Sequence, residues 1–164
     1  MALDTYGMNF TKINEMSTTV VPQPPGNFLD LRPTGYGTFV TGWGTTVSSA
    51  LYPSGQVTSA QANQLFQQDY GYAQSNVLNL TQGVSLTPQQ LAGLTDLAYW
   101  RGPNSPALRN TCAALRNKDL NGAVNYLKSI SCGYNSGAAS RFQRDSVLLN
   151  NSGSVSPATG AYVA

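Results

Sequence analysis

The stretch TGYGTFVTGWGTTV, residues 34–47, places glycines between threonines and bulky rings. Glycine serves where the backbone takes a positive φ or lets another group approach closely, and β-branched and aromatic residues favour strands. The combination predicts a tight antiparallel β-ribbon whose backbone lines a binding surface. Tyr36 and Trp43 are candidates for stacking on a flat ligand, and we expect Phe39 in the core of the ribbon.

Helices are predicted on both sides of this ribbon. Ahead of it, Tyr6, Phe10 and Ile13 recur at helical spacing and predict a helix over residues 3–16. Prolines at positions 22, 24 and 25 then exclude its continuation. After the ribbon, helix starts are indicated at Thr58 with Gln61, Thr87 with Pro88 and Gln90, Ser105 with Pro106, and Asp119. A last helix is expected over residues 136–150.

These patterns together predict an α+β fold with its sheet confined to the N-terminal third of the chain. It consists of an N-terminal helix, a small Gly-rich antiparallel β-ribbon and a mainly helical lobe. A chain of 164 residues fits one domain. We place that domain at residues 1–150 and expect a loosely held C-terminal tail at residues 151–164.

The composition narrows the chemistry that the chain can carry. Charged residues make up only 10%, with a net charge of +2, so the sequence gives no reason to expect a nucleic-acid partner. Histidine is absent, which excludes Ser-His-Asp and Cys-His catalysis and most zinc sites. We expect neither a metal nor an organic cofactor. Cys112 and Cys132 are compatible with one disulfide or with two free thiols.

Two carboxylates flank the start of the ribbon. Glu15 is the only glutamate of the chain and ends the first predicted helix, and Asp30 lies at the entrance of the ribbon. Glycoside hydrolysis needs such a pair, in which one carboxyl donates a proton and the other stays ionised. The residue type alone favours the alternative, because a lone glutamate on a helix is usually a solvated surface residue.

Five short motifs in order resemble the phage-type lysozymes, glycoside hydrolase family 24 and its pesticin-like superfamily. They are NFLD at 27–30, VTGWGTT at 40–46, SLTPQQLAGLTDLAYWRG at 85–102, LRNKDLNGAVNYL at 115–127 and RFQRDSVLL at 141–149. The resemblance covers residues 3–150. In the last motif Arg141, Asp145 and Leu148 match family positions, and we expect them to tie the last helix to the domain. Asp96, inside the third motif, is able to pair with an arginine.

The resemblance implies a muramidase, an endolysin that hydrolyses the β-1,4 bond between N-acetylmuramic acid and N-acetylglucosamine in bacterial peptidoglycan. It implies that Glu15 is the general acid and that Asp30, together with a threonine, positions the attacking water. The ribbon is then the lower wall of the substrate cleft, and the later helices are the upper wall, with Tyr99 and Arg101 near the cleft.

The expected setting follows from the same resemblance. We expect a monomer that acts on the bacterial cell wall without stable insertion into a membrane. The start MALDTYGMNF lacks a basic segment followed by an apolar core. We therefore expect synthesis in the host cytoplasm without a signal peptide.

Departures from the family pattern leave alternatives open. Residues 18–26 form an apparent insertion, and Met16 follows the glutamate where the family has glycine. The position of the family's catalytic threonine depends on how the VTGWG motif is aligned. Without a gap it falls on Val40, with a one-residue deletion on Thr41, and by the two-residue period of a strand on Thr38. We assign Thr41. In pesticin-like members the aspartate follows the turn, a position held here by Thr46. The alternatives are a non-catalytic glycan-binding or virion structural protein of lysozyme fold, or a lytic transglycosylase.

Overall fold

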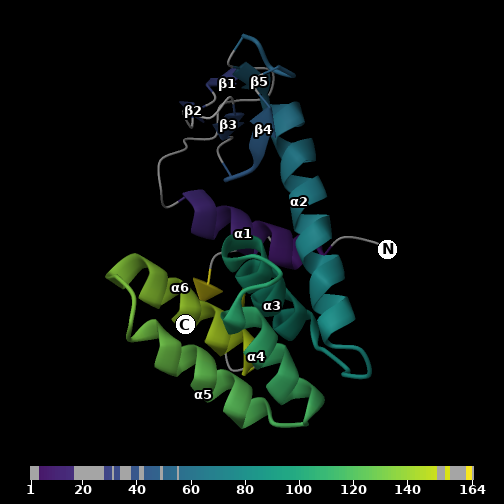
Figure 1. Cartoon of the computed structure of the whole chain (residues 1–164), viewed down its shortest axis with the longest axis vertical. Helices are drawn as coiled ribbons and strands as arrows, with labels where there is room; N and C mark the ends of the chain where they lie inside the picture. The colour runs from purple at the N-terminus through teal and green to yellow at the C-terminus, as the bar shows by residue number, and fades with distance from the viewer. Residues whose placement is uncertain are drawn as a thin grey trace. The chain divides into compact units, whose positions relative to one another are not determined.

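The computed structural model describes residues 4–16, 28–30, 32–33, 38–40, 43–48, 50–54, 56–150, 154–155 and 162–163. Its elements are, in chain order, α1 (Thr5–Met16), β1 (Phe28–Asp30), β2 (Arg32–Pro33), β3 (Thr38–Val40), β4 (Thr46–Ser48), β5 (Gln56–Thr58), α2 (Ser59–Leu80), α3 (Pro88–Arg101), α4 (Pro106–Arg116), α5 (Leu120–Ser131), α6 (Ser136–Leu149), β6 (Ser154–Val155) and β7 (Tyr162–Val163) (Figure 1). Most described residues are helical, as the sequence predicts. The chain divides into a helical unit, Met1–Thr11 with Tyr70–Ala164, and a strand-bearing unit, Lys12–Asp69.

The helix starts follow the predicted capping residues. At α3, Thr87 Oγ1 accepts from the Gln90 amide at 3.2 Å, and Gln90 Oε1 accepts from the Thr87 amide at 3.0 Å. The same reciprocal pair occurs at the start of α2 between Thr58 and Gln61, at 3.1 and 2.8 Å. Each capping box satisfies two amide groups that the first turn leaves without helical partners. These local signals therefore fix where the helices begin.

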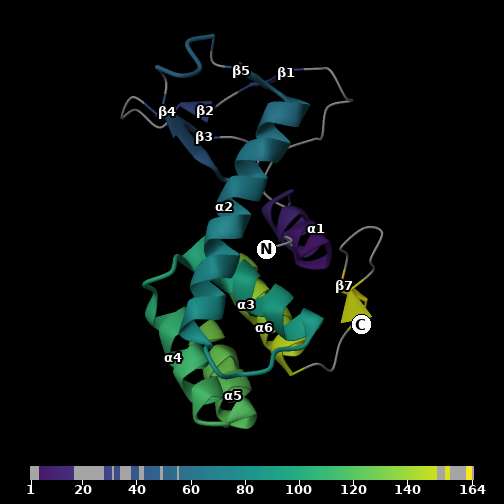
Figure 2. The same ribbon diagram turned by 90° about the vertical axis from the view of Figure 1, so that its right-hand side faces the viewer.

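The core of the helical unit surrounds α3. All seven residues from Ala92 to Ala98 are buried, and α3 lies beside α6 (Figure 2). Gly93 permits the close approach, since a β-carbon there would stand 3.0 Å from both the Asp145 carbonyl oxygen and Leu148 Cβ. The buried apolar side chains around it include Leu94, Leu97, Leu108, Leu127, Phe142 and Leu149. Each such side chain stabilises the fold by about 1.5–3 kcal/mol.

The strand-bearing unit holds short antiparallel strands. Strand β1 pairs with β5, with Phe28 opposite Thr58 and Asp30 opposite Gln56. Strands β2, β3 and β4 are neighbours in that order. Val47 on β4 is buried between exposed neighbours and joins a small core with Val57 and Ala62. Trp43, Tyr52 and Leu65 pack against this core. The side chain of Phe39, expected in the core, lies outside the described residues.

The two cysteines are free thiols: Cys112 is buried and Cys132 is exposed. Of the two alternatives that the sequence leaves open, the structure thus takes the unbridged one. In the C-terminal segment, β6 pairs antiparallel with β7, with Ser154 opposite Val163.

Candidate active site

Glu15 lies against the turn between β3 and β4. Gly44 in that turn has a φ of +85°, and a β-carbon added to it would stand 3.4 Å from Glu15 Oε2 and 3.9 Å from its Cδ. The positive φ favours glycine at this position, because other residues rarely adopt it, and the distances show that the Glu15 carboxylate is in van der Waals reach of the turn. Glu15 itself is half-buried. Its environment therefore differs from that of a glutamate on an open helix surface.

The same turn is anchored by Trp43. The Trp43 ring lies 5.8 Å from the Phe66 ring between centroids, tilted by 58°. The Lys12 ammonium lies 4.4 Å from the Trp43 centroid and 4.9 Å from the Phe66 centroid, and it donates a hydrogen bond to Asn63 Oδ1. A cation over aromatic faces is attracted by the ring quadrupole. Lys12 thus connects α1 to the turn and to the first part of α2.

Lys12 lies three residues before Glu15, so both side chains leave α1 on the same face. Burial lowers the pKa of the Lys12 ammonium because the charged form loses hydration. The contact between Lys12 and Trp43 joins residues that are distant in sequence and has no local sequence signal. Sequence reasoning accordingly missed Lys12.

The remaining predicted residues of the strand-bearing unit are placed only in part. Asp30 ends β1, and its backbone lies opposite Gln56, but its side chain lies outside the described residues. Tyr36 and Thr41 also fall outside the described residues. The structure therefore brings Glu15 together with the turn that contains Trp43, while the positions of the other three predicted groups relative to Glu15 stay predictions.

Tyr99 and Arg101 lie near the C-terminal end of α3, in the helical unit. Tyr99 is half-buried and packs against the helical core. Arg101 is exposed, and its Nη2 donates to the Tyr134 hydroxyl at 2.9 Å. Its guanidinium carbon lies 5.3 Å from the Trp100 ring centroid and 5.1 Å from that of Tyr134. Arg101 is thus held by aromatic rings, and Tyr134 is a neighbour that the sequence did not indicate.

A buried ion pair joins α3 to α6. Arg141 Nε and Nη2 each donate to Asp96 at 2.9 Å, on the two carboxylate oxygens. Asp96 is fully buried, and the Arg141 guanidinium carbon lies 5.0 Å from the Trp100 ring centroid. Burial raises the pKa of the Asp96 carboxyl, but the charge and hydrogen bonds of Arg141 outweigh it, so its pKa is lowered overall. The expected pairing of Asp96 with an arginine is confirmed, and it ties the last helix to α3.

Asp145 is buried beside this pair. Its Oδ2 accepts from Trp100 Nε1 at 3.2 Å, whereas its buried Oδ1 accepts no hydrogen bond from the described residues. Burial and the neighbouring Asp96 charge raise the pKa of the Asp145 carboxyl well above its usual value. The protonated form of Asp145 is therefore favoured, because its hydroxyl is able to donate to Asp96. This role is structural.

Comparison with known families agrees with the fold and the motifs. The family model described as phage lysozyme matches residues 29–146, and the chain belongs to this family. A search of curated proteins finds no matching relative. Membership defines the chain as a peptidoglycan-lytic enzyme.

The matched span begins after Glu15, so the family match does not cover this residue, and its catalytic role stays a prediction. Within the part of the chain that the structure describes, no helix is both long enough and apolar enough to cross a membrane.

Proposed function

We propose that the chain is a muramidase that hydrolyses the β-1,4 bond between N-acetylmuramic acid and N-acetylglucosamine, with Glu15 as general acid. The observation that carries this proposal is the half-buried Glu15 carboxylate against Gly44. The positive φ favours glycine at this point of the turn, and without a side chain the backbone there allows close approach of a sugar chain. In this proposal β3, β4 and their turn form the Gly-rich ribbon along which the substrate lies.

The proposed step is a displacement by water. Glu15 donates its proton to the glycosidic oxygen as the bond from that oxygen to the anomeric carbon breaks. Asp30 and Thr41 together position the attacking water. The water adds its hydroxyl to the anomeric carbon and gives its remaining proton to Asp30. Protonation of the leaving oxygen and activation of the water are the two tasks that glycoside hydrolysis divides between two carboxyl groups.

We further propose that Tyr36, Trp43, Tyr99 and Arg101 bind the substrate. Tyrosine and tryptophan combine a flat apolar face with a polar edge, which suits contact with a sugar ring. The Arg101 guanidinium keeps donors beyond its bond to Tyr134 and is exposed. Residues 1–150 are proposed to act as one lysozyme-like domain, followed by a loosely held tail at residues 151–164.

The test is the Glu15→Gln variant assayed on purified peptidoglycan by the release of new reducing ends. We expect the rate to fall by about 10²–10⁴-fold, the usual contribution of general acid catalysis, with an unchanged melting temperature. The matched control is Asp69→Asn, because Asp69 is an exposed carboxylate on α2; it should keep full activity. Full activity in Glu15→Gln would remove Glu15 from the mechanism.

A lytic transglycosylase is a second candidate, because Glu15 is the only glutamate of the chain and that reaction needs one acid–base group. Mass spectrometry of the released fragments separates the two reactions. Hydrolysis adds one water per cleaved bond, whereas transglycosylation leaves an anhydro sugar. Binding to peptidoglycan without any fragments would instead favour a non-catalytic glycan-binding protein.

A further inference from the structure

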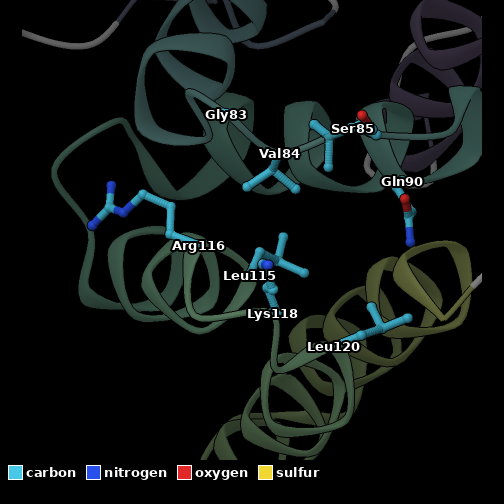
Figure 3. Close-up of a pocket in the computed structure, with 9 residues that line it drawn as sticks. Gly83, Val84, Ser85, Gln90, Leu115, Arg116, Lys118 and Leu120 are labelled. Carbon is cyan, nitrogen blue, oxygen red and sulfur yellow. The ribbon is translucent and has the colours of Figure 1, made fainter.

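The helical unit contains a hollow that none of the proposed catalytic residues lines. Its volume is about 330 Å³, within the range of small-ligand pockets. It lies between the connection from α2 to α3, the start of α3, the end of α4 and the start of α5 (Figure 3). The lining residues are Gly83, Val84, Ser85, Leu86, Gln90, Leu115, Arg116, Lys118 and Leu120.

The lining combines an apolar surface with positive charge. Val84 and Leu115 point toward one another across the hollow (Figure 3), and Leu86 and Leu120 extend the apolar surface. Arg116 and Lys118 are its charged residues, and it has no carboxylate. Within the part of the chain that the structure describes, neither of these cations has an ion-pair partner. The lining is therefore suited to a ligand with an aliphatic body and a negative group.

Lys118 occupies a backbone position at which glycine is the usual residue. Its φ is +60°. Its amide donates to the Leu115 carbonyl, and the next amide, that of Asp119, donates to the Ala114 carbonyl, both at 2.9 Å. This is the Schellman ending of a helix, whose left-handed residue is normally glycine. A lysine here strains the backbone, and strain retained at the edge of a cavity points to a role for its side chain.

Arg116 is fixed at the same edge. Its Nη1 donates to the Leu80 carbonyl at 2.7 Å, and its guanidinium is directed away from Val84 and Leu115 (Figure 3). The Lys118 ammonium beside an apolar floor matches one carboxylate with an attached aliphatic chain.

We propose that this hollow binds a small carboxylate with an aliphatic body. Such a group occurs in a free short-chain fatty acid and at the carboxyl end of a peptide with small apolar residues. The proposal goes beyond the lytic activity and does not depend on Glu15.

The first test is a titration of the full chain followed by amide chemical shifts in two-dimensional NMR. The ligands are sodium hexanoate, hexan-1-ol and hexylammonium chloride, with acetyl-D-alanyl-D-alanine as the peptide carboxylate. Hexanoate should shift the amides of residues 83–86 and 115–120 and bind about tenfold tighter than hexanol, which corresponds to one charge-assisted hydrogen bond. Tighter binding of the peptide than of hexanoate would assign the site to peptide ends. Equal affinity for hexanol, or shifts only elsewhere, would overturn the proposal.

The second test uses Lys118→Gly, a substitution that removes the charge and relieves the positive φ. We expect a melting temperature equal to or above that of the wild type, and a hexanoate affinity reduced about fivefold, as for the loss of one exposed ion pair. Arg109→Gln is the matched control, because Arg109 is exposed on α4 outside the hollow. A purely structural Lys118 would leave the hexanoate affinity of the glycine variant unchanged, which would contradict the proposal.

Discussion

The carboxylate of Glu15 lies within van der Waals reach of Gly44, because a β-carbon added to this glycine would stand 3.4 Å from Glu15 Oε2. This relationship places the only glutamate of the chain against the backbone of the glycine-rich turn. The consequence is that substitutions in the turn should act on the glutamate without changing its chemistry.

Gly44→Ala should therefore reduce lysis strongly. The added methyl group meets the Glu15 carboxylate and strains a φ of +85°, at a cost in stability of about 1–2 kcal/mol. Peptidoglycan turnover and chemical denaturation measure the two effects. The matched control is Gly83→Ala, since Gly83 has a φ of +80° but no neighbour within 4 Å of the added β-carbon. It should lose similar stability and keep its activity; an equal loss of lysis in both variants would show that strain alone is responsible.

Lys12→Met should loosen the turn. The variant keeps the aliphatic stem but loses the cation over Trp43 and Phe66, an interaction of about 0.5–2 kcal/mol. We expect lower stability and a reduced kcat on peptidoglycan, because Trp43 no longer holds Gly44 in place beside Glu15. Lys128→Met, on the exposed side of α5, should match the wild type in both measurements. Unchanged kcat in Lys12→Met would limit Lys12 to a role in packing.

Asp145→Asn should make stability less dependent on pH. The raised pKa of Asp145 means that the folded chain keeps a proton that the unfolded chain releases above its ordinary carboxyl pKa. Its contribution to stability is thus complete at low pH and is lost as the pH rises toward the folded pKa, by up to about 1.4 kcal/mol per pH unit. Asparagine reproduces the protonated carboxyl. Guanidinium denaturation at a series of pH values should show that the free energy of unfolding of the variant rises relative to that of the wild type between acid and neutral pH. An equal pH dependence in the two proteins would show that Asp145 is ionised in the folded chain.

Asp96→Asn, in contrast, should strongly destabilise the folded chain at neutral pH. It leaves the Arg141 guanidinium buried without its bidentate carboxylate, and loss of one partner of a buried ion pair costs about 3–5 kcal/mol. The lowered pKa of Asp96 places its stabilising effect above the usual carboxyl pKa, and the effect is lost as the pH falls below that value. A destabilisation below 1 kcal/mol, on the order of an exposed pair, would contradict this account.

Gly7→Ala tests the close packing between α1 and its neighbours. An added β-carbon would stand 2.0 Å from the Tyr70 hydroxyl and 3.1 Å from the Ala92 Cα. Overpacking of this kind costs about 1–3 kcal/mol. The double variant with Tyr70→Phe removes the hydroxyl, so it should be less destabilised than the sum of the two single variants. Additive effects would show that α1 shifts away as a whole.

The parts of the fold that sequence predicts are those with local causes. Thr58 with Gln61 and Thr87 with Gln90 interact across three residues, and both capping boxes are present. The helical stripes follow from the period of apolar residues in the same way. These features need no knowledge of how the helices pack.

Contacts between residues that are distant in the sequence could not be predicted from it. Lys12 reaches Trp43, and Arg101 reaches Tyr134, only after the chain has folded. Arg141 illustrates the difference. Asp145 is four residues away on its own helix, yet the bidentate partner of Arg141 is Asp96 on α3. A spacing of four predicts proximity but not which of two carboxylates the guanidinium faces.

Because the two cysteines are unbridged and only Cys132 is exposed, the folded chain offers one reactive thiol. Burial raises the pKa of the Cys112 thiol to about 11 and shields its sulfur from reagents, while Cys132 is exposed at the end of α5. A maleimide dye should accordingly attach at one position in the folded protein and at two after denaturation. Attachment at Cys132 would let fluorescence follow the enzyme on a bacterial wall without any engineered residue.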